Sequence, residues 1–384
     1  MRRAQRRLAR FQSALTGARR VLILTHNHPD PDSLAGSFLL QRLLQKRFGL
    51  TADIGYGGLI GRAENRAMVA RLRIPVRRAR ELDFHRYGAI ILVDTQPGTG
   101  NNALPPGRLP RAVFDHHPVQ PLTRFVPFHD VRADHGAAVT LIAEYLHAAE
   151  IGLDSRLATA VFYAIRSETM NLRREATTAD ARLFTQIFPL VDNRKLADIE
   201  RAPLTRTYLV ILDKAFRATR VLGNTAITRL PKIPYPDAVA ELADLILRVS
   251  GIHQAIVMGV YRGQLYFSLR TSDPRGNAGR VLQRIVGANG RAGGHETMAG
   301  GRIHPAELGR TPERMERWLV QRIRGVLGLT GVRATPLLRP RRKAEGSRKK
   351  RISARDGSSL AAAATRRDAK PAKGRNGRAK PSRR

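Results

Sequence analysis

The sequence predicts an α/β fold: a mostly parallel sheet, then a helical linker, then a smaller α+β unit. Three observations predict it. Apolar runs typical of strands alternate with helical patterns in the first half, a helical stretch follows from Gly136 to about Arg217, and the pattern changes near residue 220. Alternating strands and helices are typical of parallel sheets. At 384 residues the chain is long enough for two domains with separate cores.

The first half is expected to hold four strands. The run VLILT at 21–25 is uninterrupted and apolar, as in strands covered on both faces. Further strands are predicted at 52–56, 89–94 and 111–117. Helices are predicted through Leu34 to Leu44 and over 63–72. We therefore expect helices on both faces of the sheet and ligands at the carboxyl ends of its strands.

The second half ends in a smaller unit that begins after three prolines at 231, 234 and 236. Its expected elements, in order, are a helix (237–249), a hairpin (254–270), a helix (278–287), a glycine-rich turn (291–301) and a last helix near Trp318. The predicted domains are a basic N-terminal surface helix (1–20), the sheet domain (21–195), a helical linker (196–220), the α+β domain (221–335) and a basic tail (336–384).

The chain is strongly basic, with a formal net charge of +37. The predicted tail holds 18 Lys or Arg against 3 Asp or Glu, or +15, and few large apolar side chains. Such a segment cannot bury enough surface to offset its ordering entropy, so we expect disorder. Its charge favours contact with longer nucleic acid. The alternative is a compositional bias towards arginine without a binding role.

Composition excludes several classes of protein. Without cysteine there is no disulfide, thiolate zinc site or cysteine nucleophile, so any metal is held by oxygen and imidazole nitrogen. Such ligands favour Mn²⁺ or Mg²⁺ over zinc or cobalt. No apolar stretch is long enough to span a membrane, and the basic N-terminus lacks the apolar segment of a signal peptide. A cytoplasmic protein is expected, although a mitochondrial-type presequence is compatible with this composition.

Acidic and imidazole groups gather after three predicted strands. They are His26, Asp30 and Asp32 after the first, Asp94 after the third, and Asp115, His116 and His117 after the fourth. A single such group is usually a helix cap or part of a polar loop. Three groups at one edge of a sheet supply enough ligands for two ions that share a bridging carboxylate.

These groups resemble the motifs of a known family. HxxPDxD before a helix, a lone Asp at a strand end and then DHH are similar to motifs of the DHH phosphoesterases. SLR at 268–270, AGGH at 292–295 and MAGG at 298–301 resemble the associated DHHA1 domain. The resemblance extends from about Val21 to Leu327. That family includes RecJ-like exonucleases, inorganic pyrophosphatases, short-oligoribonuclease and pAp phosphatases, and cyclic-dinucleotide phosphodiesterases.

The resemblance implies a role for each motif residue. One metal would be held by His26, Asp30 and Asp94, and the other by Asp32, Asp94 and His116. Catalytic roles fall to His117, which would face the phosphate, and to Asp115, which would orient the histidine pair. Glu168 stands where the family usually has an aspartate that binds the second metal, and it is expected to serve as that ligand. In the second domain, a substrate clamp is implied for Ser268, Arg270, Gly293, Gly294 and His295. The alternatives there are an ordinary turn and a solvated strand end.

The function implied is a phosphoesterase with two Mn²⁺ ions, or Mg²⁺ or Co²⁺ in their place. It would hydrolyse short RNA or DNA oligonucleotides or phosphorylated nucleotides such as pAp. One alternative is a cyclic-dinucleotide, polyphosphate or pyrophosphate hydrolase of the same family. Another is a weakly active nucleic-acid-binding protein, and a homodimer is left open.

Overall fold

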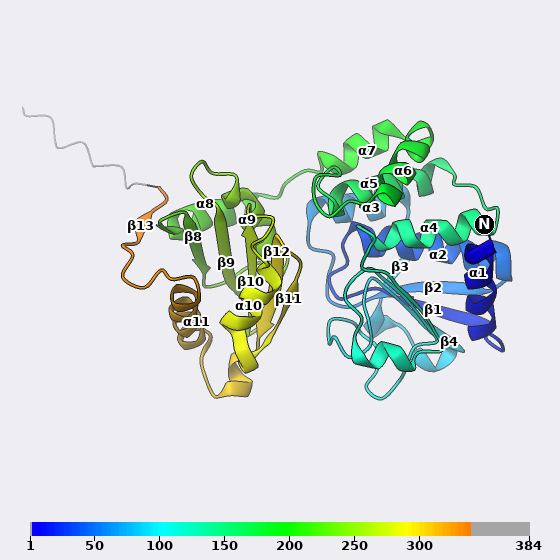
Figure 1. Cartoon of the computed structure of the whole chain (residues 1–384), viewed down its shortest axis with the longest axis horizontal. Helices are drawn as coiled ribbons and strands as arrows, with labels where there is room; N and C mark the ends of the chain where they lie inside the picture. Colours follow the sequence, from blue (N-terminus) through cyan, green and yellow to red (C-terminus); the bar gives the residue numbers. More distant parts are fainter. Residues whose placement is uncertain (1, 339–384) are drawn as a thin grey trace, which may run out of the picture. The chain divides into compact units, whose positions relative to one another are not determined.

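The first sheet consists of parallel strands (Figure 1). The structure is a computed structural model that describes residues 2–338. Six strands lie in the order β3-β2-β1-β4-β5-β6, and each neighbouring pair is parallel. Their bounds are β1 (Arg20–Leu24), β2 (Thr51–Tyr56), β3 (Val76–Arg78), β4 (Ala89–Val93), β5 (Ala112–Asp115) and β6 (Phe128–Val131). The predicted parallel sheet is confirmed.

The strand order reverses between β1 and β4. The chain runs outward from β1 to β2 and β3 and then returns to place β4 on the other side of β1. Leu24 of β1 lies beside Leu92 of β4, so these two strands end together. Parallel sheets bind their ligands at the carboxyl ends of strands where the order reverses. The three strands that precede the acidic and imidazole groups, β1, β4 and β5, are adjacent here.

The α-helices of this domain cover one face of the sheet. They are α1 (Arg2–Ala14), α2 (Pro31–Phe48), α3 (Ala63–Leu72), α4 (Ala138–Ala148), α5 (Ser155–Glu168), α6 (Thr178–Ile187) and α7 (Asn193–Glu200). Their buried side chains form one core with Ile23, Ile91 and Phe114 of the strands. The expectation of helices on both faces is therefore wrong for the described residues.

The opposite face is covered by short 3-10 segments and loops. Leu22, Leu92 and Val113 pack there against Leu82 and Tyr87. Right-handed crossovers place the β4–β5 and β5–β6 connections on this face. Within those connections the structure has only loops and the 3-10 helix η3 (Pro121–Phe125). The alternating pattern of strands and helices did not reveal that these two connections contain no α-helix.

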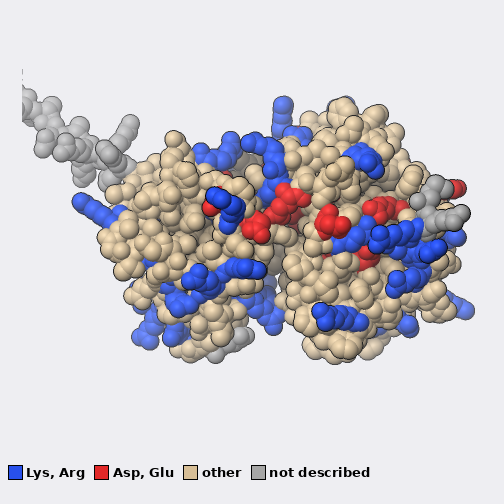
Figure 2. All heavy atoms as spheres, viewed as in Figure 1, with Lys and Arg blue, Asp and Glu red and all other residues tan. Residues whose placement is uncertain are grey.

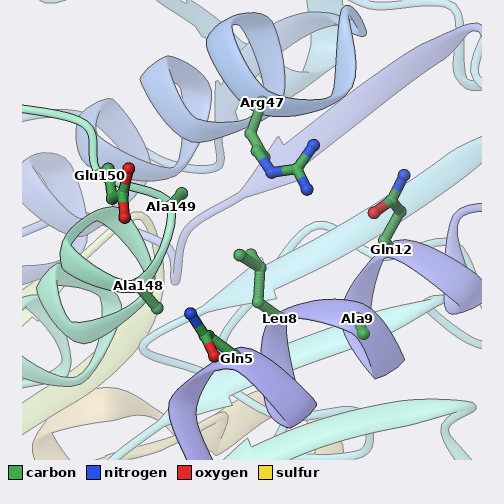
Figure 3. A pocket seen from close by; sticks show the side chains of 8 residues that line it. All are labelled: Gln5, Leu8, Ala9, Gln12, Arg47, Ala148, Ala149 and Glu150. Carbon is green, nitrogen blue, oxygen red and sulfur yellow. The ribbon is translucent and has the colours of Figure 1, made fainter. Parts of the chain in front are cut away.

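Helix α1 is anchored more deeply than a surface helix. Leu8, Phe11 and Leu15 are buried, and the Phe11 ring lies edge-on to Phe114 at a centroid distance of 5.0 Å. This helix also borders a pocket of about 340 Å³, with Gln5 and Gln12 facing Arg47 of α2 and Glu150 after α4 (Figure 3). None of the predicted site residues lines that pocket.

The second sheet has the order β11-β12-β10-β9-β8-β7-β13, and only β8 and β9 pair in parallel. Its strands are β7 (Arg220–Leu222), β8 (Thr225–Leu230), β9 (Gln254–Tyr261), β10 (Gln264–Thr271), β11 (Arg291–Gly294), β12 (Met298–Ile303) and β13 (Thr335–Pro336). The segment expected as a glycine-rich turn is thus the hairpin β11–β12. The sequence did not indicate these two strands, because glycine is depleted in strands and gives no alternating pattern of side chains.

Helices cover both faces of this second sheet. One core joins α8 (Arg206–Ala218) and α9 (Ala238–Leu247) to the sheet, through residues such as Ile211, Leu242 and Val257. The other core joins α10 (Ala278–Val286) and α11 (Pro312–Val326), for example through Leu282 and Leu319. Helix α8 therefore packs into the second domain's core, although the sequence indicated a linker.

The predicted basic tail lies almost wholly outside the described residues. Its first residue, Pro336, belongs to β13 and pairs with Arg220 of β7. Within the described part of the chain, Lys and Arg side chains are spread over the visible face of the protein (Figure 2). No helix described in the structure is long and apolar enough to cross a bilayer.

Candidate metal centre

His26 and Asp30 occupy the loop from β1 into α2. Asp30 is the N-cap of α2, where its Oδ1 accepts the N–H of Ser33 at 2.9 Å, and Pro31 is compatible with the first helical turn. The His26 Nδ1 lies 2.9 Å from the carbonyl oxygen of Asn27, to which it can donate. Its Nε2 then faces Asp30 Oδ1 at 3.4 Å and Asp94 Oδ2 at 3.5 Å.

Asp94 follows β4 and lies between the two histidine groups. It has a φ of 57°, a left-handed conformation that aspartate tolerates better than most residues. Its side chain is buried, with Oδ2 towards His26 and Oδ1 at 3.5 Å from Nε2 of His116. Oδ1 makes no hydrogen bond to any described residue. A buried carboxylate oxygen without a donor is costly unless a cation accompanies it.

Asp115 organises the two histidines that follow β5. Its Oδ1 accepts the backbone N–H groups of His116 and His117 and lies 2.8 Å from the His117 Nδ1. Its Oδ2 accepts the side-chain amide of Gln96 at 2.7 Å. The His116 Nδ1 is 3.2 Å from the carbonyl oxygen of His135, to which it can donate. His116 and His26 thus present Nε2 to Asp94 in the same way.

Asp32 connects the centre to helix α4. Its two carboxylate oxygens accept the N–H groups of Ala138 and Val139, at 2.7 and 2.8 Å. Its Oδ2 also lies 3.8 Å from Nε2 of His116. Each carboxylate oxygen has two lone pairs, so the helix bonds leave Asp32 able to accept further contacts.

The electrostatics of the cluster favour a bound cation. Burial lowers the pKa of His26 and of His116, but the neighbouring aspartates outweigh burial and raise both values well above normal. Burial raises the pKa of Asp32, and the charge of Asp94 raises it further. Burial raises the pKa of Asp115, yet the charge and hydrogen bond of His117 dominate and lower it. These carboxylates therefore draw positive charge into the site, whether as protons or as a metal.

Two groups of three residues have ligand atoms within 4.8 Å of one another, and both include Asp94. One is His26, Asp30 and Asp94, which is the set that the sequence resemblance implied. The other is Asp94, His116 and His117, so His117 stands there in place of the expected Asp32. Because His117 directs Nδ1 to Asp115, that nitrogen is already engaged.

Glu168 lies near the centre but outside both groups. It is the last residue of α5, and burial raises the pKa of its carboxyl, as do the charges of Asp30 and Asp94. The charge of His116 acts on it in the opposite direction. Glu168 is thus within electrostatic reach of the metal-binding groups, and no ion pair in the described structure joins it to them.

His295 of the second domain lies beside the histidine pair. Its ring centroid is 5.0 Å from that of His117 and 5.9 Å from that of His116. It follows β11, in the turn of the hairpin, and its Nδ1 is 3.4 Å from a carboxylate oxygen of Glu175. Its Nε2 is buried and has no hydrogen-bond partner among the described residues.

The other predicted clamp residues are engaged within the second domain. The guanidinium of Arg270 binds Asp244 at 2.6 Å and the hydroxyl of Ser268 at 2.7 Å, and its side chain is only 11% exposed. Gly294 has a φ of 153°, and a Cβ there would meet the carbonyl oxygen of Met298 at 2.2 Å. Gly293 has open space around it. Arg270 would have to leave Asp244 to grip a ligand.

Gln96 is a residue that sequence reasoning missed. Its buried amide donates to Asp115 and to the carbonyl of Pro118, and it accepts from Gln120 and Thr123. It therefore fixes the Asp115 carboxylate against η3. Its position two residues after Asp94 was the only signal in the sequence.

Comparison with known families supports the predicted identity of the second domain. A family model described as the DHHA1 domain matches residues 223–321, which confirms the expected DHHA1-type domain. An uncharacterized protein of Methanocaldococcus jannaschii is 34% identical over 286 residues, which are 74% of this chain and 58% of that protein. The chain thus spans less than two thirds of that relative's length.

Two solved structures complete the comparison. An exopolyphosphatase-related protein from Bacteroides fragilis has a TM-score of 0.64 at 13% identity, covering 85% of this chain and 98% of its own. RecJ from Thermus thermophilus, solved with Mn²⁺, has a TM-score of 0.41 at 15% identity, over 84% of this chain and 55% of its own. The first of these shows that the two-domain fold is shared.

Proposed function

We propose that this protein is a metal-dependent phosphoesterase, because its motifs resemble those of the DHH/DHHA1 family and residues 223–321 match the DHHA1 domain. Its substrates would be short oligonucleotides or phosphorylated nucleotides. The observation that carries the proposal is Asp94, a buried carboxylate whose two oxygens each face the Nε2 of a different histidine.

The residues of the centre fit divalent ions. His26 and His116 each have Nδ1 next to a backbone carbonyl, which fixes the tautomer that offers the Nε2 lone pair to a metal. Asp94 Oδ1 is buried and accepts no hydrogen bond from residues 2–338, as expected of an oxygen that binds a cation. Oxygen and imidazole ligands without sulfur suit Mn²⁺, with Mg²⁺ or Co²⁺ as substitutes.

We assign the ligands as follows. His26, Asp30 and Asp94 would hold one ion, and Asp94, His116 and Asp32 the other, with Glu168 approaching the second. We keep Asp32 in this set because His117 has its Nδ1 bound to Asp115. Bound divalent ions would supply a water of lowered pKa and neutralise negative charge on the phosphoryl group.

We infer that His117 acts on the substrate. Its side chain is 40% exposed, whereas those of Asp94 and His116 are buried. Burial lowers its pKa, but Asp115 outweighs burial and raises it, which favours the protonated ring. With Nδ1 on Asp115, the free Nε2–H can donate to a phosphoryl oxygen or to the leaving group.

His295 would contact the substrate from the second domain, since its ring lies against that of His117. Arg270 would join only after exchanging Asp244 for a substrate group. The DHHA1 domain favours nucleotide substrates over pyrophosphate in this proposal. The exopolyphosphatase-related neighbour shares the fold alone, and polyphosphate therefore stays in the test as the second candidate.

The experiment is a panel of substrates with the Mn²⁺-loaded full chain. It contains pAp, phosphorylated RNA dinucleotides and pentanucleotides, cyclic di-AMP, polyphosphate and pyrophosphate. We expect the highest kcat/KM with pAp or the dinucleotides. The Asp94→Asn variant, which keeps the shape but removes the charge, is the control for contaminating activity. If the Mn²⁺-loaded chain hydrolyses none of these compounds, the proposal is wrong.

A further inference from the structure

Arg174 lies in the loop that follows Glu168, and one of its nitrogens has no partner among the residues that the structure describes. One terminal nitrogen donates to the carbonyl oxygen of Glu168 at 2.6 Å, and the other lies 3.5 Å from the sulfur of Met170. The Nε is buried and finds no acceptor among the described residues. A buried donor that is left unpaired destabilises the folded state, and more so when the group is charged.

The loop that carries Arg174 has an unusual backbone. Met170, Asn171, Leu172 and Glu175 all have positive φ values between 48° and 61°. The backbone N–H groups of residues 173 and 174 both bond to the carbonyl oxygen of Thr169, which folds the loop back onto the end of α5. Non-glycine residues keep such conformations only where the surroundings enforce them, and such strain often accompanies function.

The guanidinium is held beside Glu168, since one of its terminal nitrogens bonds the carbonyl oxygen of that residue. Burial is the largest influence on the pKa of Glu168, Glu175 and His295, and the charge of Arg174 acts on all three. Yet no ion pair joins Arg174 to Glu168 or Glu175, whose carboxylates are both described in the structure. Neutralising a carboxylate therefore does not explain where the Nε–H is directed.

Two other unpaired atoms belong to the same surroundings. Asp94 Oδ1 and His295 Nε2 are also buried and lack hydrogen bonds to described residues. A cation satisfies Asp94, while an anion with several acceptor oxygens satisfies an arginine N–H. A phosphoryl group next to the metal ligands provides such oxygens.

We propose that Arg174 is a phosphate-binding residue, whose Nε–H donates to a non-bridging oxygen of the substrate's phosphoryl group. This inference rests on the proposed phosphoesterase function and adds a residue to it. Because arginine stays protonated, the contact persists over the whole working pH range. A lysine does not replace it, since lysine has a methylene where arginine has Nε.

The test compares Arg174→Met with Arg173→Met, a matched change at the exposed neighbouring position. Binding of inorganic phosphate to the Mn²⁺-loaded full chain is measured by calorimetry, and Mn²⁺ affinity is measured separately. We expect Arg174→Met to weaken phosphate binding about 10- to 100-fold, as for the loss of a bond to a charged group. Phosphate binding by Arg173→Met, and Mn²⁺ affinity in both variants, should match wild type.

Several results would overturn the inference. Unchanged phosphate affinity in Arg174→Met, or an equal loss in Arg173→Met, contradicts it directly. If Arg174→Met loses Mn²⁺ affinity, the role of Arg174 is instead to position Glu168, through its bond to the Glu168 carbonyl oxygen. If Arg174→Met does not fold, Arg174→Lys decides, and wild-type phosphate affinity there rules out the Nε–H bond. A wild-type chain that neither binds phosphate nor hydrolyses any phosphoester refutes the proposed function itself.

Discussion

At the scale of single residues, the position of a side chain in the sheet decides whether it joins the cluster of possible metal ligands more than its residue type does. His26, Asp94 and His116 meet because β1, β4 and β5 are neighbours and end at one edge. His28 belongs to the same motif as His26, yet its ring packs against Gly58 and its Nδ1 lies 3.1 Å from the carbonyl of Leu59. It therefore lies outside both potential metal groups.

Glu168 gives a prediction at this scale. Glu168→Gln keeps the length of the side chain and removes its charge, so Mn²⁺ affinity should fall about 10- to 100-fold, as for other groups that tune a metal site. Glu168→Asp keeps the charge and should retain or raise activity. Both effects are read from Mn²⁺ titrations and kcat. Wild-type Mn²⁺ affinity in Glu168→Gln would remove Glu168 from the centre.

The sequence predicted which acidic and imidazole residues gather at the sheet edge better than it predicted the residues that support them. Motifs at strand ends can be recognised in the sequence because a strand and the residues that directly follow it are neighbours along the chain. Gln96 and Arg174 could not be found in this way, since their contacts depend on how two loops fold. Arg270 was predicted as a free clamp, and nothing in the sequence indicated that Asp244 of α9 would occupy it.

At the scale of elements, the sequence failed to predict strands that are very short or rich in glycine. Strands with continuous apolar runs, such as β1 and β4, lie within a residue or so of their predicted bounds, and α3 matches residue for residue. The short strands β3 and β6 were missed, because three or four residues give too little periodicity. The hairpin β11–β12 was missed because glycine replaces the side chains that signal a strand.

Helix α9 carries a group whose titration should affect stability. Burial raises the pKa of Glu241 from 4.5 to about 7, against the opposing charge of Arg62, 3.6 Å away. The folded state therefore holds this proton more tightly than the unfolded chain. The stability that this group contributes is fully present below about pH 4.5 and is lost as the pH rises to about 7.

The variant Glu241→Gln mimics the protonated form and should remove this dependence. Its free energy of unfolding, relative to wild type, should increase from pH 4.5 to 7 by at most about 3 kcal/mol and then level off. Urea unfolding at several pH values measures it, with Asp213→Asn at an exposed site of α8 as control. A constant difference between Glu241→Gln and wild type would show that Glu241 titrates normally.

At the scale of the whole molecule, the charge of +37 favours polyanionic partners. We propose that the segment from residue 339 onwards adds affinity for longer RNA without contributing to chemistry. Its removal should leave kcat on pAp unchanged and make the salt dependence of RNA binding shallower by roughly 0.7 for each RNA phosphate that the segment neutralises. RNA titrations at several salt concentrations measure the slope. Equal slopes with and without the segment would leave compositional bias as its explanation.

We propose that Asp94 holds two metal ions in one centre. The number of Mn²⁺ ions bound by the full chain can be counted, and electron paramagnetic resonance detects whether those ions are coupled. We expect two coupled ions per wild-type chain, and we expect Asp94→Asn to lose both that coupling and the hydrolysis. A wild-type chain that binds a single ion, or two ions that stay coupled in Asp94→Asn, would contradict it.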